Sequence, residues 1–168
     1  LDITSGIPVI PDNIKEFSLS FPYSHQHIAF IVKDERRAEF VDWKDIVDRK
    51  DLIIGIPEKV FYKKAIDAYF SNGKAWEIST PRLFFKEKFK HIDAMLLGAP
   101  AASAWTLLNP NYTVVSPKPL LPALTMAFPI NKNDHSFELF MRNWIKMKKK
   151  NKSLDRLFSY WIEGEQPN

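Results

Sequence analysis

The sequence predicts an α/β fold built on a mostly parallel sheet that helices cover on both faces. Short apolar runs at residues 27–33, 51–57 and 92–98 have the length and composition of buried strands. Stretches with helical spacing of apolar side chains lie between them, and this alternation is typical of parallel sheets. A chain of 168 residues with 45% hydrophobic residues is long enough to bury one sizeable core.

The expected elements follow one another along most of the chain, after an irregular, Pro-containing start at residues 6–13. Pro81 suits the first turn of a helix, and Gly73 and Gly164 suit the ends of two others. The Pro-rich residues 116–119 are expected to act as a hinge. Strands are expected at residues 27–33, 51–57, 74–78, 92–98, 112–115 and 124–129, and helices at 40–49, 58–70, 81–90, 100–108, 137–145 and 154–163.

Composition and charge limit the function classes. The chain has no Cys, which excludes disulfides and thiolate metal sites. The net charge of +4 arises mainly from five lysines between residues 146 and 152, a pattern typical of a solvated helix end. No nucleic-acid-binding motif accompanies these lysines, so no nucleic-acid partner is expected. His25 and His27 lie at strand spacing, but two ligands are too few for a metal site, and no cofactor is expected.

Membrane and export signals are not apparent in the sequence. No apolar run approaches the ~20 residues that span a bilayer. The first residues lack a basic segment followed by an apolar one, as a signal peptide would have. The chain is therefore expected to be a soluble piece of a processed or longer protein.

Several segments carry a resemblance to a known family. Residues 19–23, Leu-Ser-Phe-Pro-Tyr, resemble the segment at which family 3 extracellular solute-binding proteins cross from their first lobe to their second. Residues 52–56 and 92–97 are similar to two strands of the second lobe, and residues 154–164, together with Trp144, resemble the closing helices. These proteins are type 2 periplasmic binding proteins, whose two lobes close on a solute.

The resemblance implies a domain organisation and a location. Residues 1–22 would end an incomplete first lobe, residues 23–120 would form the second lobe, and residues 121–168 would return to the first. Residues 102–110 and 114–119 are similar to binding-protein-like domains fused to bacterial transport proteins. The resemblance therefore implies a periplasmic or extracytoplasmic module with a membrane transport protein, or a fused membrane domain, as its partner.

The positions that hold an amino acid in this family are occupied differently here. An acidic residue that receives the ligand ammonium would stand at Gly98, and a Gly-Thr or Gly-Ser turn would stand at Lys59-Val60. The hydroxyl and Arg positions of the carboxylate clamp read Gly6, Pro8, Ile10 and Asn13. The expected ligand is therefore a different small polar or anionic solute, unless the site is vestigial.

Strand ends and nearby aromatic residues supply the candidate ligand-binding side chains. In parallel sheets, ligands bind at the carboxyl ends of the strands. Cations there can hold an anion, although such cations are more often solvated residues at a helix start. Aromatic rings there can stack on a solute, although they serve at least as often in core packing. The candidates are Tyr23, Lys59, Ser79, Thr80, Arg82, Ser103 and Trp105.

Three functions stay open at the level of sequence. The first is non-catalytic solute binding or sensing, because no catalytic constellation is present. The second is a degenerate structural or interaction domain, which could form a domain-exchanged homodimer through its incomplete lobe. The third is a lyase or dehydratase on the same fold, for which Glu58 is the acidic residue expected at a strand end.

Overall fold

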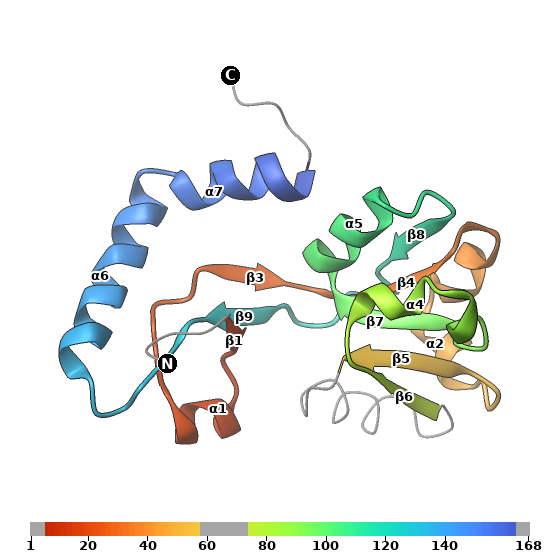
Figure 1. The fold of residues 1–168 in the computed structure, drawn as a ribbon, viewed down its shortest axis with the longest axis horizontal. Coiled ribbons are helices and arrows are strands. Elements are labelled where there is room, and N and C mark those ends of the chain that lie inside the picture. The colour runs from red at the N-terminus through yellow and green to blue at the C-terminus, as the bar shows by residue number, and fades with distance from the viewer. Residues whose placement is uncertain (1–5, 58–73, 164–168) are drawn as a thin grey trace. The chain divides into compact units, whose positions relative to one another are not determined.

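The computed structural model describes residues 6–57 and 74–163 of the chain (Figure 1). The chain divides into two compact units, and each is described by itself. Unit 1 consists of residues 1–26 and 123–168, and unit 2 consists of residues 27–122. The lobe boundaries expected near residues 22 and 121 stay a prediction.

Unit 2 holds a five-stranded sheet with the order β6-β5-β7-β4-β8. Its helical segments are η1 (Asp34–Phe40), α2 (Trp43–Val47), α4 (Pro81–Phe84), η2 (Glu87–Phe89) and α5 (Ala99–Leu107). Its strands are β4 (Ile28–Lys33), β5 (Ile53–Pro57), β6 (Lys74–Ile78), β7 (Ala94–Gly98) and β8 (Tyr112–Val115). The helix expected at residues 58–70 lies outside the described residues.

The sheet is mixed, although most of its strands point the same way. Strand β5 pairs in parallel with both β6 and β7. Strand β4 pairs antiparallel with β7 and with β8, so β8 points the same way as β7. Four of the five strands therefore run in one direction, and β4 is inserted against them between β7 and β8. The α/β class is confirmed, and the antiparallel β4 is the feature that the apolar runs did not reveal.

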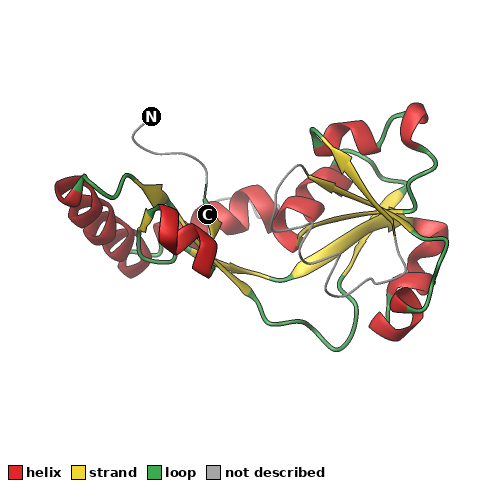
Figure 2. Cartoon of the chain, turned by 90° about the horizontal axis from the view of Figure 1, so that it is seen from below, coloured by secondary structure: helices red, strands yellow, loops and turns green. Residues whose placement is uncertain are grey.

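Helical segments cover both faces of this sheet, as Figure 2 shows. Side chains alternate between the faces along β4, as the strand geometry requires. Ala29 and Ile31 join a core cluster that includes Ala102 of α5 and Phe84 of α4. On the other face, the ring of Phe30 lies 5.5 Å from that of Phe40 in η1. Alternate residues of one apolar strand therefore supply two separate layers of core.

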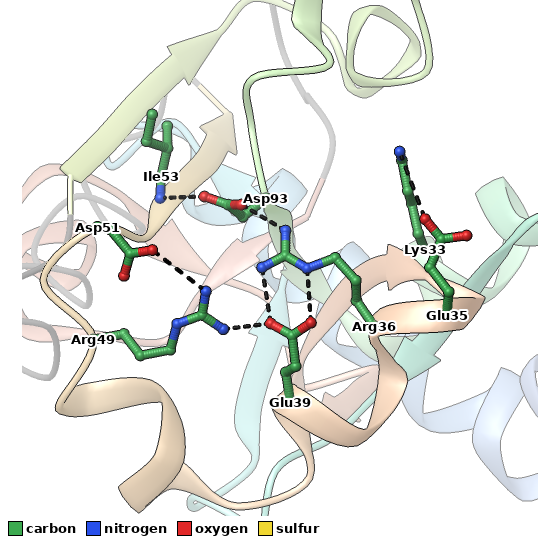
Figure 3. Close-up of polar contacts among 8 residues, drawn as sticks. All are labelled: Lys33, Glu35, Arg36, Glu39, Arg49, Asp51, Ile53 and Asp93. Atoms are coloured by element: carbon green, nitrogen blue, oxygen red, sulfur yellow. Dashed lines mark hydrogen bonds and ion pairs between the residues drawn. The ribbon is translucent and has the colours of Figure 1, made fainter.

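An ionic cluster joins η1 to the amino-terminal ends of β5 and β7 (Figure 3). Asp93, which directly precedes β7, accepts a hydrogen bond of 2.5 Å from Arg36 and one of 2.8 Å from the backbone N–H of Ile53. The Arg36 guanidinium also binds both carboxylate oxygens of Glu39, at 3.0 and 2.9 Å. Arg49 donates a further hydrogen bond to Glu39. The cluster thus ties two neighbouring parallel strands to the segment that covers one face.

The Pro-rich segment expected as a hinge is tied to α2. Lys118 donates a backbone hydrogen bond to Val41 and accepts one from Trp43. The Trp43 indole N–H donates to the carbonyl of Pro119 at 2.9 Å. These three bonds hold residues 118 and 119 within unit 2. The hinge expected at residues 116–119 stays a prediction.

Unit 1 contains two small sheets and the C-terminal helices. Its strands are β1 (Ile7–Pro8), β2 (Ser18–Leu19), β3 (Ser24–Gln26), β9 (Leu124–Ala127) and β10 (Pro129–Ile130), paired in the orders β1-β9-β3 and β10-β2. Its helices are α1 (Pro11–Glu16), α6 (His135–Lys150), α7 (Ser153–Phe158) and the π-helical turn η3 (Ser159–Glu163). The prediction of an irregular start at residues 6–13 is wrong, because β1 and the beginning of α1 occupy it. Strands of two or three residues are too short to show the alternation of apolar and polar residues by which a strand is predicted from sequence.

Large apolar side chains are exposed along unit 1. Asp134 caps α6 by accepting from the N–H of Phe137, and the helix buries Met141 and Ile145. Other apolar side chains of unit 1 are more than half exposed, namely Ile14, Leu139, Phe140, Met147, Leu157 and Trp161. Within the described ranges, no helix combines the length and the apolar character needed to cross a bilayer.

Asp93→Ala should destabilise the protein, because Ile53 loses its acceptor and Arg36 loses one of its two carboxylates. We expect the free energy of unfolding to fall by about 2 kcal/mol, measured by urea denaturation. Asp51→Ala is the matched control, since its carboxylate is 81% exposed and lies 3.7 Å from Arg49. The control should change stability by less than ~0.5 kcal/mol. Equal losses in both variants would contradict the structural role of Asp93.

Glu39→Gln should make the free energy of unfolding depend less steeply on pH in the acid range. The hydrogen bond from Arg36, supported by Arg49, lowers the pKa of Glu39 from 4.5 to about 2. The unfolded chain therefore binds more protons in this range, and the stability that Glu39 contributes is lost as pH falls from about 4.5 to about 2. Urea titrations across this window measure the slope. Glu35→Gln should leave this slope unchanged, because the Glu35 carboxylate is exposed and lies 3.9 Å from Lys33.

Candidate functional site

The parallel strands of unit 2 end at one edge of the sheet. Strands β5, β6 and β7 end at Pro57, Ile78 and Gly98. Because parallel strands share an edge for their carboxyl ends, the residues after Ile78 and after Gly98 lie at this edge. Ser79 and Thr80 follow β6 there and are both exposed. Lys59 falls outside the described residues.

Helix α5 begins at the same edge. Gly98 is its N-cap and has no side chain to offer, while Pro100 stands in the first turn. The N–H of Ala99 donates to the carbonyl of His27 at 2.8 Å, so the first backbone donor of the helix is engaged within the unit. Gly98 is fully covered and pairs with Ile28. The edge therefore presents hydroxyl groups after β6 and an uncharged helix start after β7.

Two of the predicted residues meet at a small cavity away from Ser79 and Thr80. Arg82 in α4 and Trp105 in α5 both line a cavity of about 200 Å³, together with Phe85, Lys86, Leu108 and Asn109. Trp105 is half-buried, and its ring stacks on that of Phe85 with centroids 6.0 Å apart. It also packs against the core cluster of unit 2. Trp105 thus serves both as a packing residue and as a cavity wall.

Ser103 has a different environment from the other candidates on α5. It is half-buried, and its backbone carbonyl accepts a hydrogen bond of 3.0 Å from the Thr106 hydroxyl. Ser103 lines neither this cavity nor the larger one beside it. The predicted set therefore separates into Ser79 and Thr80 at the strand edge, Arg82 and Trp105 at the cavity, and Ser103 within α5.

A larger cavity of about 540 Å³ adjoins the small one and was not anticipated from the sequence. The two cavities share the lining residues Phe85, Lys86, Leu108 and Asn109, so they are adjacent. The remaining lining comes from the end of β4, the start of β8 and the turns around η2, namely Lys33, Asp34, Glu35, Glu87, Lys90, Pro110, Asn111 and Tyr112. We call the whole depression the α4–α5 groove. The lining residues come from the three ranges 33–35, 82–90 and 105–112, which are far apart in the chain, and no local sequence pattern marks them as one lining.

The larger part of the groove carries charges of both signs. Lys90 lies 2.5 Å from Glu87, and this pairing raises the pKa of Lys90. Lys33 lies 3.9 Å from Glu35. Burial raises the pKa of Tyr112, so its phenol is neutral near pH 7 and can donate a hydrogen bond. This part of the groove therefore suits a polar or dipolar group.

Comparisons with known proteins identify the fold. No protein-family model matches the sequence, and no curated protein sequence matches it significantly. Among solved structures, an ancestral amino-acid-binding protein, described as a precursor of cyclohexadienyl dehydratase, matches with a TM-score of 0.83 at 22% identity. The match covers 96% of this chain and 69% of that one. The chain has the type 2 periplasmic-binding-protein fold.

Two further structures support the same conclusion. An amino acid ABC transporter substrate-binding protein from Streptococcus pneumoniae, bound to L-arginine, has a TM-score of 0.86 at 18% identity. It matches over 96% of this chain and 68% of its own. The GluR0 ligand-binding core in complex with L-glutamate has a TM-score of 0.78 at 15% identity, over 93% and 69% of the two chains. Identities this low show the shared fold alone.

Tyr23, the remaining candidate from the sequence, packs within unit 1. Its ring stacks on Phe128 with centroids 4.6 Å apart, and its backbone N–H donates to Met126. Burial raises the pKa of the Tyr23 phenol. A Cβ atom at Gly6 would lie 1.9 Å from the Tyr23 hydroxyl oxygen, so this tyrosine occupies the space of a side chain at position 6.

The two histidines at strand spacing also have local partners. His25 in β3 lies with its Nδ1 3.2 Å from the Thr125 hydroxyl. His27 Nδ1 lies 3.0 Å from the carbonyl of Leu121. Among the described residues, no group of three or more His, Cys, Asp or Glu side chains is arranged to hold a metal ion.

Proposed function

We propose that this chain is a solute-binding or sensing module that acts outside the cytoplasmic membrane together with a transport system. The observation that carries the proposal is the fold match over 96% of the chain to proteins described as amino-acid-binding or as ABC transporter substrate-binding. Fold alone does not determine function, so the ligand has to be argued from the residues present. The membrane partner is a transport protein or a fused membrane domain.

The ligand that we propose is a small polar or anionic solute other than a standard α-amino acid. The resemblance places the clamp for an amino-acid carboxylate at Gly6, Pro8, Ile10 and Asn13. Tyr23 fills the space beside Gly6, and the Asn13 side-chain amide donates to the carbonyl of Pro8 at 2.7 Å. Gly98 has no carboxylate for a ligand ammonium. These contacts favour a different ligand chemistry from that of the structural neighbours.

A second candidate function is an interaction domain that forms a homodimer. The exposed apolar side chains of α6, α7 and η3 favour it, because contiguous apolar surface commonly marks an interface. Phe140 and Met147 are both more than half exposed and lie seven residues apart, which places them on one side of α6. A second copy of the chain would offer the same apolar side chains in return.

A lyase or dehydratase activity receives less support. One structural neighbour, itself an amino-acid-binding protein, is described as a precursor of cyclohexadienyl dehydratase, and this description is the support for such an activity. The acidic residue expected to act in this chain, Glu58, lies outside the described residues. We therefore propose a binding module and no reaction.

A ligand screen tests the binding function directly. The full 168-residue chain should gain about 3–6 °C in Tm at ten times the Kd of its solute, because ligand binding stabilises only the folded state. Amino acids, dicarboxylates, phosphate and sulfate form the panel. The double variant Ser79→Ala with Thr80→Val should reduce the shift, while Ser136→Ala on α6 should preserve it. A panel without any shift would overturn solute binding and favour the interaction domain.

Light scattering tests the dimer. The chain should shift from monomer to dimer as its concentration rises, and Phe140→Glu with Trp161→Glu should keep it monomeric by placing charges in the apolar contact. Asn133→Glu, an exposed site before α6, should leave the dimer intact. A monomer at all concentrations for the unmodified chain would contradict the proposal.

A further inference from the structure

The small end of the α4–α5 groove carries two cations without an anion to match them. Arg82 and Lys86 both line the 200 Å³ cavity and are exposed. Among the residues that the structure describes, no hydrogen bond or ion pair engages either side chain, and no acidic residue lines this cavity. By contrast, Lys90 at the other end is paired with Glu87. A guanidinium and an ammonium at one cavity, both available, form a receptor for a carboxylate or a similar anion.

The wall beside these cations is aromatic and held in place. Trp105 stacks on Phe85 with an interplanar angle of 28°, and Phe85 also meets Tyr112 edge-on at 5.0 Å. Phe85 and Trp105 both pack against the buried core, so their orientation is fixed by the fold. Leu108, which is 75% exposed, lines both cavities and adds apolar surface to them. A rigid aromatic wall next to an anion receptor favours a ligand with a planar apolar body.

The size of the groove agrees with a small molecule. The larger cavity of about 540 Å³ lies within the range of ~300–1,000 Å³ typical of small-molecule sites. Its lining includes Asp34, whose side chain makes no hydrogen bond or ion pair among the described residues, and the neutral phenol of Tyr112. A polar substituent on the far side of the ligand would find partners there.

We propose that the α4–α5 groove is a binding site for an aryl carboxylate, separate from the strand edge at Ser79 and Thr80. The carboxylate binds between Arg82 and Lys86, and the aromatic ring lies against Trp105 and Phe85. The site lies wholly within unit 2. It does not rest on the solute-binding function proposed above, because the groove is lined by neither Ser79 nor Thr80.

The test uses the full chain and 3-phenylpropionate as the probe. Binding is followed by the NMR shift of the Trp105 indole N–H, with a Trp105→Phe variant to assign that signal. We expect saturable binding of 3-phenylpropionate, and weaker binding of both propionate, which lacks the ring, and 3-phenylpropanamide, which lacks the charge. Equal binding of the amide would overturn the role of the cations. Absence of saturable binding would overturn the site.

Variants separate the groove from other surfaces. Arg82→Ala with Lys86→Ala should weaken binding about tenfold or more, because hydrogen bonds to charged groups are lost. Arg82→Lys should recover only part of it, since an ammonium lacks the guanidinium fork. Arg37→Ala removes an exposed arginine of unit 2 outside the groove and should have no effect. Both alanine sites are exposed, so the variants should keep their Tm.

The same variants distinguish this proposal from the previous one. Binding of 3-phenylpropionate that is lost in the Arg82 and Lys86 variant and kept in the Ser79 and Thr80 variant supports a separate groove site. The opposite pattern would overturn it and place the anion at the strand edge. If the panel of small solutes gives no Tm shift while 3-phenylpropionate binds, the groove proposal is supported and the solute-binding proposal is contradicted.

Discussion

The carboxylate of Asp93 holds together the sheet on which every other feature of unit 2 depends. It receives the Arg36 guanidinium from η1 and the N–H of Ile53 at the start of β5, while Asp93 itself directly precedes β7. The backbone N–H of Asp93 also donates to Ile53. These bonds hold the amino-terminal ends of β5 and β7 in register. Because the two strands are parallel, their carboxyl-terminal ends are then also held next to each other. Asp93 lies within residues 92–97, one of the segments that carry the resemblance, and these contacts give it a structural role.

The groove exists because α4 is short. Pro81 starts the helix as the sequence predicts, yet it ends at Phe84, and η2 follows after a turn. That turn places Phe85 against Trp105 and Tyr112, while Arg82 and Lys86 stay exposed. A continuous helix over residues 81–90 would present these side chains at other angles. The break in the helix thus places an aromatic wall beside two cations that line the same cavity.

Apolar runs made the strands of unit 2 predictable, since a strand buried on both faces leaves a continuous apolar signal. Residues 27–33, 51–57 and 92–98 contain β4, β5 and β7. The same reasoning missed the two- and three-residue strands of unit 1, which depend on distant partners such as β9. Among the site candidates, Arg82 was predicted from its position near a strand end and Trp105 from its aromatic ring, and both line the proposed groove. Lys86 and Asp34 of that groove were not predicted, because an isolated charged residue in a sequence looks like any solvated one.

By itself, the sequence determined the α/β class, the strands of the main sheet and the resemblance that the structural neighbours support. These properties follow from local composition and from alternation along the chain. Only the tertiary structure decided the direction of β4, the packing of Tyr23 over Gly6 and the placing of Arg82 and Trp105 at one cavity. Each of these depends on contacts between residues far apart in the chain. Such contacts are set by the shape of the folded core, and no local pattern in the sequence records them.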